Sequence, residues 1–343
     1  MILKNSNIEI NVPWYKISGI VNENNSGEKI TWDLTSAAKI ITNEIGAERL
    51  RALHKINKTT ELTFCVLPWL LFISIWYLIS TLQWGWYTPF LCLAQSIVII
   101  NFFYAVRHDA LMHRQIGGSK IAYVLGILYS IPMGNTYTDF LRHEDHHVHV
   151  GYDLFEEHIA ELDTRWKRWF CLTMLGYFLL FMGKLKTPGT VYPNKDWKQP
   201  AVVKRMRKTE GILILIWYIT LIVLAFYFPY AILVGYFIPL IIISPVLLSL
   251  KNACQHSETD TNNLLHLSVF LRSNLVLRII YFNSLGTGHL VHHIFPRIPF
   301  WKIHKASKLI EPILVRNNIP QRSFTEVVYN YFIKAVPYRK KWD

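Results

Sequence analysis

Two long stretches of this 343-residue chain contain no lysine or arginine at all: residues 61–106 and residues 211–250. Charged residues are scarce along the whole chain, at 17% of the total, whereas soluble domains carry about 25%. Hydrophobic residues account for 52% of the sequence and aromatic residues for 14%. This composition excludes a disordered chain and argues against a soluble protein.

Cysteine is also scarce, and the sequence lacks an early apolar run. The four cysteines lie far apart and form no C-x-x-C pair, which excludes a disulfide framework and a zinc finger. The first apolar run begins near residue 62, too late for a cleaved signal peptide. We therefore expect reduced cysteines and no cleaved leader.

The two stretches without lysine or arginine are each long enough for two membrane crossings, because one crossing needs about 20 apolar residues. The Trp-Gly-Trp-Tyr segment at residues 84–87 divides the first stretch, and Pro229 divides the second. Aromatic residues at such turns suit the membrane–water boundary. We predict an all-α integral membrane protein with four transmembrane helices arranged as two hairpins. The predicted spans are residues 62–83, 88–106, 211–228 and 230–250.

All 36 lysines and arginines lie outside these spans, and the net charge is +13. Residues 1–60 contain 8 of them, residues 107–210 contain 15, and residues 251–343 contain 13. Under the positive-inside rule, these three segments and both termini face the cytoplasm. A surface near lipid headgroups then explains the positive charge, and we expect membrane lipids rather than nucleic acid as partners.

Two further apolar runs, residues 121–134 and 169–183, are short for a crossing and fit interfacial or buried helices. A crossing by residues 169–183 alone would place residues 251–343 outside, against the charge rule. Residues 33–56 are typical of one or two amphipathic helices. The predicted parts of the chain are a cytosolic N-terminal segment at residues 1–60, a membrane domain at residues 61–315 and a basic cytosolic tail at residues 316–343.

Histidine occurs 14 times, and nine of these residues fall into four groups on the predicted cytoplasmic side. The groups are His108 with His113; His143 with His146 and His147; His256; and His289 with His292 and His293. Two groups have the pattern H-x-x-H-H. One such pattern is often an ordinary surface cluster, but two in one chain are improbable by chance.

Helical spacing explains how these groups can bind metal. Residues i, i+3 and i+4 share a helix face, so each H-x-x-H-H pattern can direct three imidazoles toward one point. Asn252 and His256 also share a face. His108 and His113 do not, so they serve two different ions or the helix unwinds between them. Neutral imidazole suits iron, copper, nickel or zinc, and the spacing does not choose among them.

The combination of an H-x(4)-H box and two H-x-x-H-H boxes with two helical hairpins resembles the membrane-bound fatty acid desaturase superfamily. Residues 288–299, with the sequence Gly-His-Leu-Val-His-His-Ile-Phe-Pro-Arg-Ile-Pro, are similar to its third box and the following Phe-Pro-x-x-Pro segment. The resemblance covers roughly residues 60–315. The loop at residues 252–260 is more similar to the diverse bacterial branch, which favours a bacterial inner membrane over the endoplasmic reticulum.

The resemblance implies a helical cytosolic cap that carries the boxes, two iron ions as cofactor and O2 as co-substrate. The implied iron ligands are His108, His113, His143, His146, His147, His256, His289, His292 and His293. Asn252 matches a position that holds iron through water in acyl-CoA desaturases, and we predict a catalytic role for it; the alternative is a helix-end hydrogen bond. No His-Pro-Gly-Gly motif of a fused haem domain is present, so electrons are expected from a separate donor such as ferredoxin or cytochrome b5.

Desaturation of an acyl lipid is the predicted reaction, on acyl-CoA, acyl-carrier protein or a membrane lipid. Iron and O2 together can break an unactivated C–H bond, which zinc cannot. Hydroxylation, or oxidative decarboxylation to a terminal alkene, would use the same site and stays open. A membrane metal transporter is a distant alternative, because residues 62–106 and 211–250 contain no Asp, Glu, Lys, Arg or His.

Overall fold

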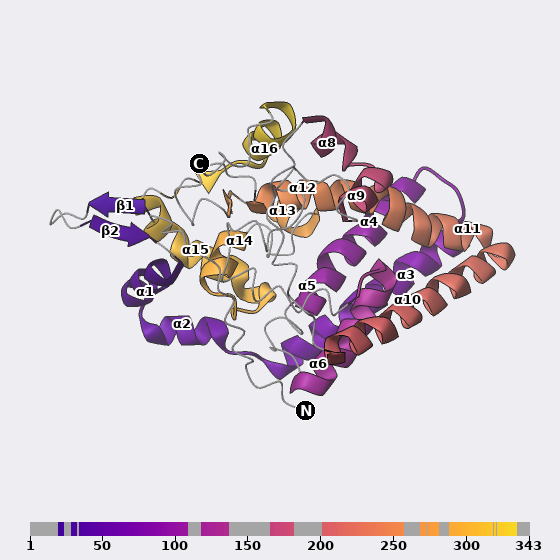
Figure 1. Ribbon diagram of the computed structural model, residues 1–343, viewed down its shortest axis with the longest axis horizontal. Coiled ribbons are helices and arrows are strands. Elements are labelled where there is room, and N and C mark those ends of the chain that lie inside the picture. Colours follow the sequence, from indigo (N-terminus) through magenta and orange to yellow (C-terminus); the bar gives the residue numbers. More distant parts are fainter. Residues whose placement is uncertain are drawn as a thin grey trace.

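The computed structural model describes residues 20–23, 29–32, 34–108, 118–136, 165–181, 201–256, 268–272, 274–280, 288–317, 319 and 321–334. Within these ranges the chain is mostly helical (Figure 1). The elements before residue 200 are β1 (Ile20–Glu23), β2 (Lys29–Trp32), α1 (Leu34–Ile45), α2 (Ala47–His54), α3 (Lys58–Leu82), α4 (Thr88–Ile97), the π-helix η1 (Val98–Phe103), α5 (Tyr104–Arg107), α6 (Gly118–Ser130), the 3-10 helix η3 (Ile131–Met133), α8 (Arg165–Phe170) and α9 (Met174–Phe181). The elements after residue 200 are α10 (Ala201–Tyr227), α11 (Pro229–Ile232), the π-helix η5 (Leu233–Ile243), α12 (Ser244–His256), β3 (Phe270–Leu271), α13 (Leu275–Ile280), α14 (His289–Ile294), α15 (Phe300–Arg316), β4 (Gln321–Arg322), α16 (Phe324–Val328) and the π-helix η7 (Tyr329–Lys334).

Four helical stretches are long and apolar enough to cross a membrane, which confirms that part of the prediction. In one apolar 18-residue segment of each stretch, the buried share is 17% for the first and 11% for the third, against 56% for the second and 44% for the fourth. The first and third, which contain α3 and α10, are therefore the outer helices, and their exposed apolar side chains suit contact with lipid. The four stretches are Lys58–Leu82, Thr88–Arg107, Lys204–Tyr227 and Pro229–Gln255.

The helix ends follow from local sequence. The Asn57 side chain caps α3 by accepting hydrogen bonds from the backbone N–H groups of Thr59 and Thr60, at 2.9 and 3.2 Å. Pro229 occupies the first turn of α11, where its missing N–H costs no helical hydrogen bond. The two turns expected near residues 84–87 and at Pro229 therefore separate consecutive long helices.

The inner surfaces of the long helices pack closely and share polar contacts. Gly235 of η5 lies against Trp76 of α3, and a Cβ at Gly235 would lie only 2.6 Å from the indole Cδ1. Tyr236 donates a hydrogen bond from its hydroxyl to the Pro132 carbonyl at 2.6 Å and accepts one from Trp217 Nε1 at 2.9 Å. These bonds connect η5 and α10 to η3, so the apolar run at residues 121–134 is a helical segment that contacts the long helices.

The N-terminal helices pack against the third histidine box. Residues 33–56, where one or two amphipathic helices are expected, contain two helices, α1 and α2. Ala37 and Ile41 of α1 are completely buried in the same core as Leu290 of α14 and Ile303 of α15. This part of the chain therefore supports the histidine region directly. Before α1, the strands β1 and β2 form an antiparallel pair that the all-α prediction lacked.

The run at residues 169–183 does not form one helix over its described part: α8 ends at Phe170 and α9 begins at Met174. Nearby Arg168 is buried, donates a hydrogen bond to the Tyr331 carbonyl at 2.8 Å and lies 4.5 Å from the centre of the Tyr331 ring. Ser249 of α12 donates to the Cys171 carbonyl at 2.7 Å. The segments around α8 and η7 thus hold α12 in place.

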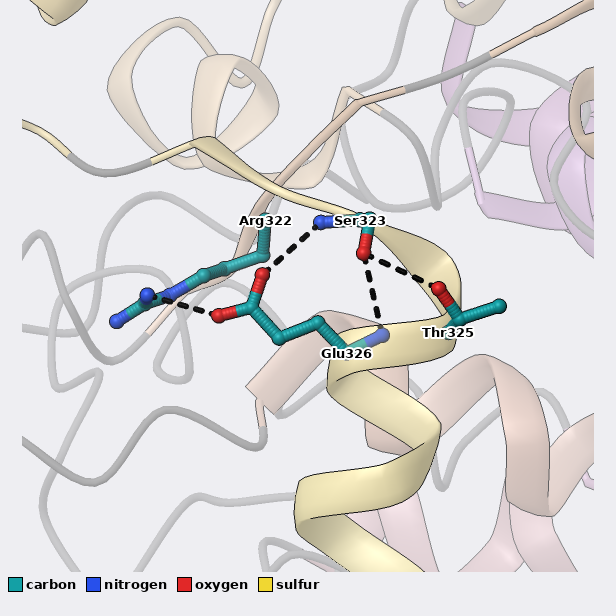
Figure 2. A network of polar contacts seen from close by, with 4 residues as sticks. All are labelled: Arg322, Ser323, Thr325 and Glu326. Carbon is teal, nitrogen blue, oxygen red and sulfur yellow. Dashed lines mark hydrogen bonds and ion pairs between the residues drawn. The ribbon is translucent and has the colours of Figure 1, made fainter.

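A capping box begins α16, which packs against α12 (Figure 2). The Ser323 hydroxyl accepts a hydrogen bond from the backbone N–H of Glu326 at 3.2 Å, and the Glu326 carboxylate accepts one from the Ser323 N–H at 3.4 Å. The same carboxylate pairs with Arg322 at 2.9 Å. Residues of β4, just before this box, pair in parallel with β3. Both contacts fix the surroundings of α12, the helix that carries Asn252 and His256.

Candidate metal centre

His108 directly follows η1 and α5, which form the end of the second membrane-length helix. Its side chain is only 2% exposed. Its ring stacks on that of Tyr104, one turn earlier, with centroids 5.8 Å apart and an interplanar angle of 24°. The first histidine of the first box is therefore directed into the protein and away from solvent.

The short helix α14 carries the third histidine box, and all six of its residues are buried. It contacts α1, α15 and β3. The imidazoles of His289, His292 and His293 are 3%, 1% and 3% exposed. Burial of three histidines on one short helix requires hydrogen bonds or a bound cation, because unpaired polar groups are costly in the interior.

Imidazoles from these two helices lie side by side. The ring centroids of His108 and His292 are 4.6 Å apart, although 184 positions separate them along the chain. Within α14, the centroids of His289 and His293 are 4.4 Å apart, and their Nε2 atoms face each other at 2.9 Å. The structure therefore brings together part of the first predicted ligand group and all of the fourth.

The end of α12 reaches the same place. Gln255, which is 1% exposed, has its amide nitrogen 3.3 Å from Nδ1 of His289. Its backbone carbonyl accepts a hydrogen bond from Val269 N–H at 3.0 Å. The backbone positions of Asn252 and His256 lie on α12, one helical turn apart. The third predicted group thus belongs to a helix whose end contacts the fourth.

The remaining predicted ligands fall outside the described residues or lack a described side chain. Residues His113, His143, His146 and His147 are outside the described ranges. Asn252 and His256 are described as helix positions only. Within the described residues, no group of three or more His, Cys, Asp or Glu side chains has an arrangement that could hold a metal ion. The described part is consequently a portion of the predicted centre.

The donor chemistry of this portion fits a transition metal. Neutral imidazole nitrogen is a good ligand for iron and its neighbours in the first transition row. The Nε2 atoms of His289 and His293, at 2.9 Å, can both lie about 2.1 Å from a common point, which is a usual metal–imidazole distance. A cation at that point would replace the proton that two facing imidazole nitrogens otherwise share.

Two buried cations around Tyr104, whose ring stacks on that of His108, were missed by sequence reasoning. Arg107 is 1% exposed and Lys251 is 3% exposed. The Lys251 ammonium lies 3.2 Å from the centre of the Tyr104 ring, and the Arg107 guanidinium carbon lies 5.7 Å from it. Such a cation–π contact is worth about 2 kcal/mol when desolvated. Each residue directly follows one of the two stretches without lysine or arginine, and this position could have indicated burial. From the sequence alone, both count only as cytoplasmic charges.

The cysteines and two further histidines do not belong to the centre. All four cysteines are free thiols, as expected. Burial raises the pKa of the Cys171 thiol to about 12, so it stays protonated at neutral pH and is a poor metal ligand. His54 contacts the Leu50 carbonyl within its own helix at 2.9 Å. Burial, and then the charges of Arg278 and Lys308, lower the pKa of His304, which keeps it neutral on α15.

Comparison with known proteins identifies the family of the chain. The family model described as Fatty acid desaturase matches residues 84–325, which include all nine grouped histidines and Asn252. A comparison with curated proteins found no match. The match covers more than half of the chain and extends from the turn before α4 to α16. The chain therefore belongs to the membrane fatty acid desaturase family.

Proposed function

We propose that this chain is an O2-dependent diiron oxidoreductase that introduces a double bond into the acyl chain of a lipid. The main support is the buried group of His108, His289, His292 and His293 beside the membrane-length helices. Membership of the fatty acid desaturase family implies an oxidoreductase that acts on an acyl lipid. The carrier of the acyl chain is proposed to be CoA, acyl-carrier protein or a membrane lipid.

Two iron ions would be held by all four histidine groups. The proposed ligands are His108, His113, His143, His146, His147, His256, His289, His292 and His293. When bound, iron would supply, together with O2, an oxidant able to break an unactivated C–H bond. Asn252 is proposed to occupy a weakly held position, because an amide oxygen is a poorer ligand than imidazole and is easily replaced by water.

The protein's own contribution would be orientation and the exclusion of water. The imidazoles of His108 and of the three histidines on α14 are between 1% and 3% exposed, and α1, α15 and β3 pack against α14. Burial of this kind strengthens electrostatic interactions and prevents side reactions with water. The apolar surfaces of α3 and α10 would keep the site beside the bilayer, from which an acyl chain can enter.

The proposed topology has two helical hairpins, with both termini and a helical cap on the cytoplasmic side of a bacterial inner membrane. It is supported by the absence of Lys and Arg from the stretches at residues 61–106 and 211–250. The N-terminal segment would belong to the cap, since α1 packs on α14. The segments at residues 1–60, 61–315 and 316–343 would then differ in sequence composition but would not fold as separate units.

Electrons would come from a separate carrier such as ferredoxin or cytochrome b5. The two large segments proposed to be cytoplasmic hold 15 and 13 of the 36 lysines and arginines. Positive charge of this extent would attract an acidic carrier by long-range electrostatics and would speed its association.

Hydroxylation and oxidative decarboxylation to a terminal alkene remain alternatives on the same site, because the position of the acyl chain decides the product. Metal transport is disfavoured. Metal transport through the membrane needs charged or histidine side chains inside the spans, and residues 62–106 and 211–250 contain no Asp, Glu, Lys, Arg or His.

Mass spectrometry of lipids tests the reaction. Cells that express the chain should gain acyl chains lighter by two hydrogens, and His292→Ala should reduce this product by more than about 100-fold, because even the loss of an outer-shell partner costs 10–100-fold. His304→Ala is the matched control, since His304 is a neutral histidine outside the centre, and should keep wild-type product. A gain of one oxygen would indicate hydroxylation, and unchanged lipids would contradict both reactions.

The role of Asn252 can be separated from that of His256. Asn252→Ala should keep most of the iron, because a weak amide ligand would contribute little to the affinity for iron. The variant should lose most of the turnover, because the coordination position that Asn252 occupies would be the one open to O2. His256→Ala should lose iron as well. Iron content and turnover of the purified variants are the two measurements. Wild-type turnover in Asn252→Ala would favour a helix-end hydrogen bond, and complete loss of iron would make Asn252 a structural ligand.

Reporter fusions test the topology. Fusions at residues 200 and 270 should give cytoplasmic signals, because the segments that contain them carry most of the positive charge. Single cysteines near Gly85 and Pro229 should react with impermeant reagents added from the other side. An external signal at residue 200 or residue 270 would rule out the two-hairpin arrangement.

A further inference from the structure

Gln255 contacts the third histidine box and has no role in the family resemblance or in the predicted ligand set. It is 1% exposed and lies on α12 immediately before His256. Its amide nitrogen is 3.3 Å from Nδ1 of His289. It therefore contacts one predicted ligand and adjoins another along the chain.

In this arrangement the amide nitrogen of Gln255 has a hydrogen-bond partner among the described residues, but its amide oxygen does not. Its oxygen Oε1 is buried and has no hydrogen-bond partner among the described residues. Buried amide oxygens are almost always hydrogen-bonded. The two ends of an amide have nearly the same shape, so rotation by half a turn would exchange oxygen and nitrogen without changing the packing. The site can therefore present either a donor or an acceptor to His289.

The two orientations correspond to two tautomers of His289. A neutral imidazole carries one N–H. When the amide nitrogen donates to Nδ1, the proton of a neutral His289 is on Nε2, which faces Nε2 of His293 at 2.9 Å. When Nε2 of His289 instead binds a metal ion, its proton moves to Nδ1 and needs an acceptor. The Gln255 oxygen, after rotation of the amide, is in place to accept it.

We propose that Gln255 is a positioning residue for His289: its amide oxygen accepts the Nδ1–H of His289 when Nε2 binds iron, and its amide nitrogen donates to Nδ1 when iron is absent. This role rests on the proposed diiron function. Metal-binding histidines usually donate their second N–H to an oxygen acceptor, which fixes the ring and strengthens the ligand. The bond from Val269 N–H to the Gln255 carbonyl holds the backbone from which the amide reaches.

The chain offers a matched control in Gln95. It is also a completely buried glutamine, its amide nitrogen donates to a backbone carbonyl (that of Phe72) at 3.2 Å, and its Oε1 also has no partner among the described residues. It lies on α4, within a membrane-length helix and outside the histidine group. Gln95→Leu therefore removes a similar amide from the core without touching a predicted ligand.

Iron retention in the purified full-length chain tests the proposal. Iron-loaded wild type, Gln255→Leu, Gln255→Glu and Gln95→Leu are titrated with an Fe2+ chelator, and the protein-bound iron is measured by elemental analysis. Gln255→Leu should hold iron roughly 10–100-fold more weakly, the range for loss of an outer-shell partner. Gln255→Glu keeps an oxygen acceptor and should restore retention to within about threefold of wild type. Gln95→Leu should match wild type.

Three results would overturn this role while leaving the diiron function intact. In the first, Gln255→Leu holds iron as tightly as wild type. In the second, Gln255→Leu and Gln255→Glu lose iron affinity equally. In the third, Gln255→Leu and Gln95→Leu lose iron affinity equally. The last two would assign the effect to packing. If Gln255→Leu does not accumulate in the membrane, Gln255→Met, which keeps the chain length without the amide, takes its place in the same comparison. A wild type that binds no iron would overturn the proposed function and this role together.

Discussion

Burial of histidine beside the membrane-length helices is the constraint on which the arrangement depends. Imidazole nitrogens in a nearly dry interior need partners, because an unsatisfied polar group there costs about 1–3 kcal/mol. His292 is 1% exposed, and the centroid of its ring lies 4.6 Å from that of His108, which belongs to another helical segment. The packing of α1 and α15 on α14, and the contact of Gln255 with His289, serve the same end: they keep water out and hold the rings in place.

Positive charge has two roles in this chain. All 36 lysines and arginines lie outside the stretches at residues 61–106 and 211–250, where most of them suit a lipid surface. Arg107 and Lys251 are different, since both are buried around Tyr104, whose ring stacks on His108. Aromatic contact offsets part of the cost of removing these cations from water.

The sequence was sufficient for features set by local composition and spacing. Stretches without lysine or arginine predicted the four long helices, and the H-x-x-H-H spacing predicted three histidines on one helix, which α14 shows. Contacts between distant segments could not be predicted. The approach of Gln255 to His289 and the packing of α1 on α14 depend on tertiary structure, which hydrophobic periodicity does not encode. Charge counting likewise could not distinguish buried Lys251 from an exposed lysine.

Metal analysis of the purified protein tests the account most directly. Wild-type chain produced with ample iron should contain about two iron ions, since the four histidine groups supply ligands for two. Replacement of His289, whose Nε2 lies 2.9 Å from that of His293, should remove at least one of them while the four long helices still insert in the membrane. Zinc in place of iron, no bound metal, or an unchanged iron content in His289→Ala would contradict the account.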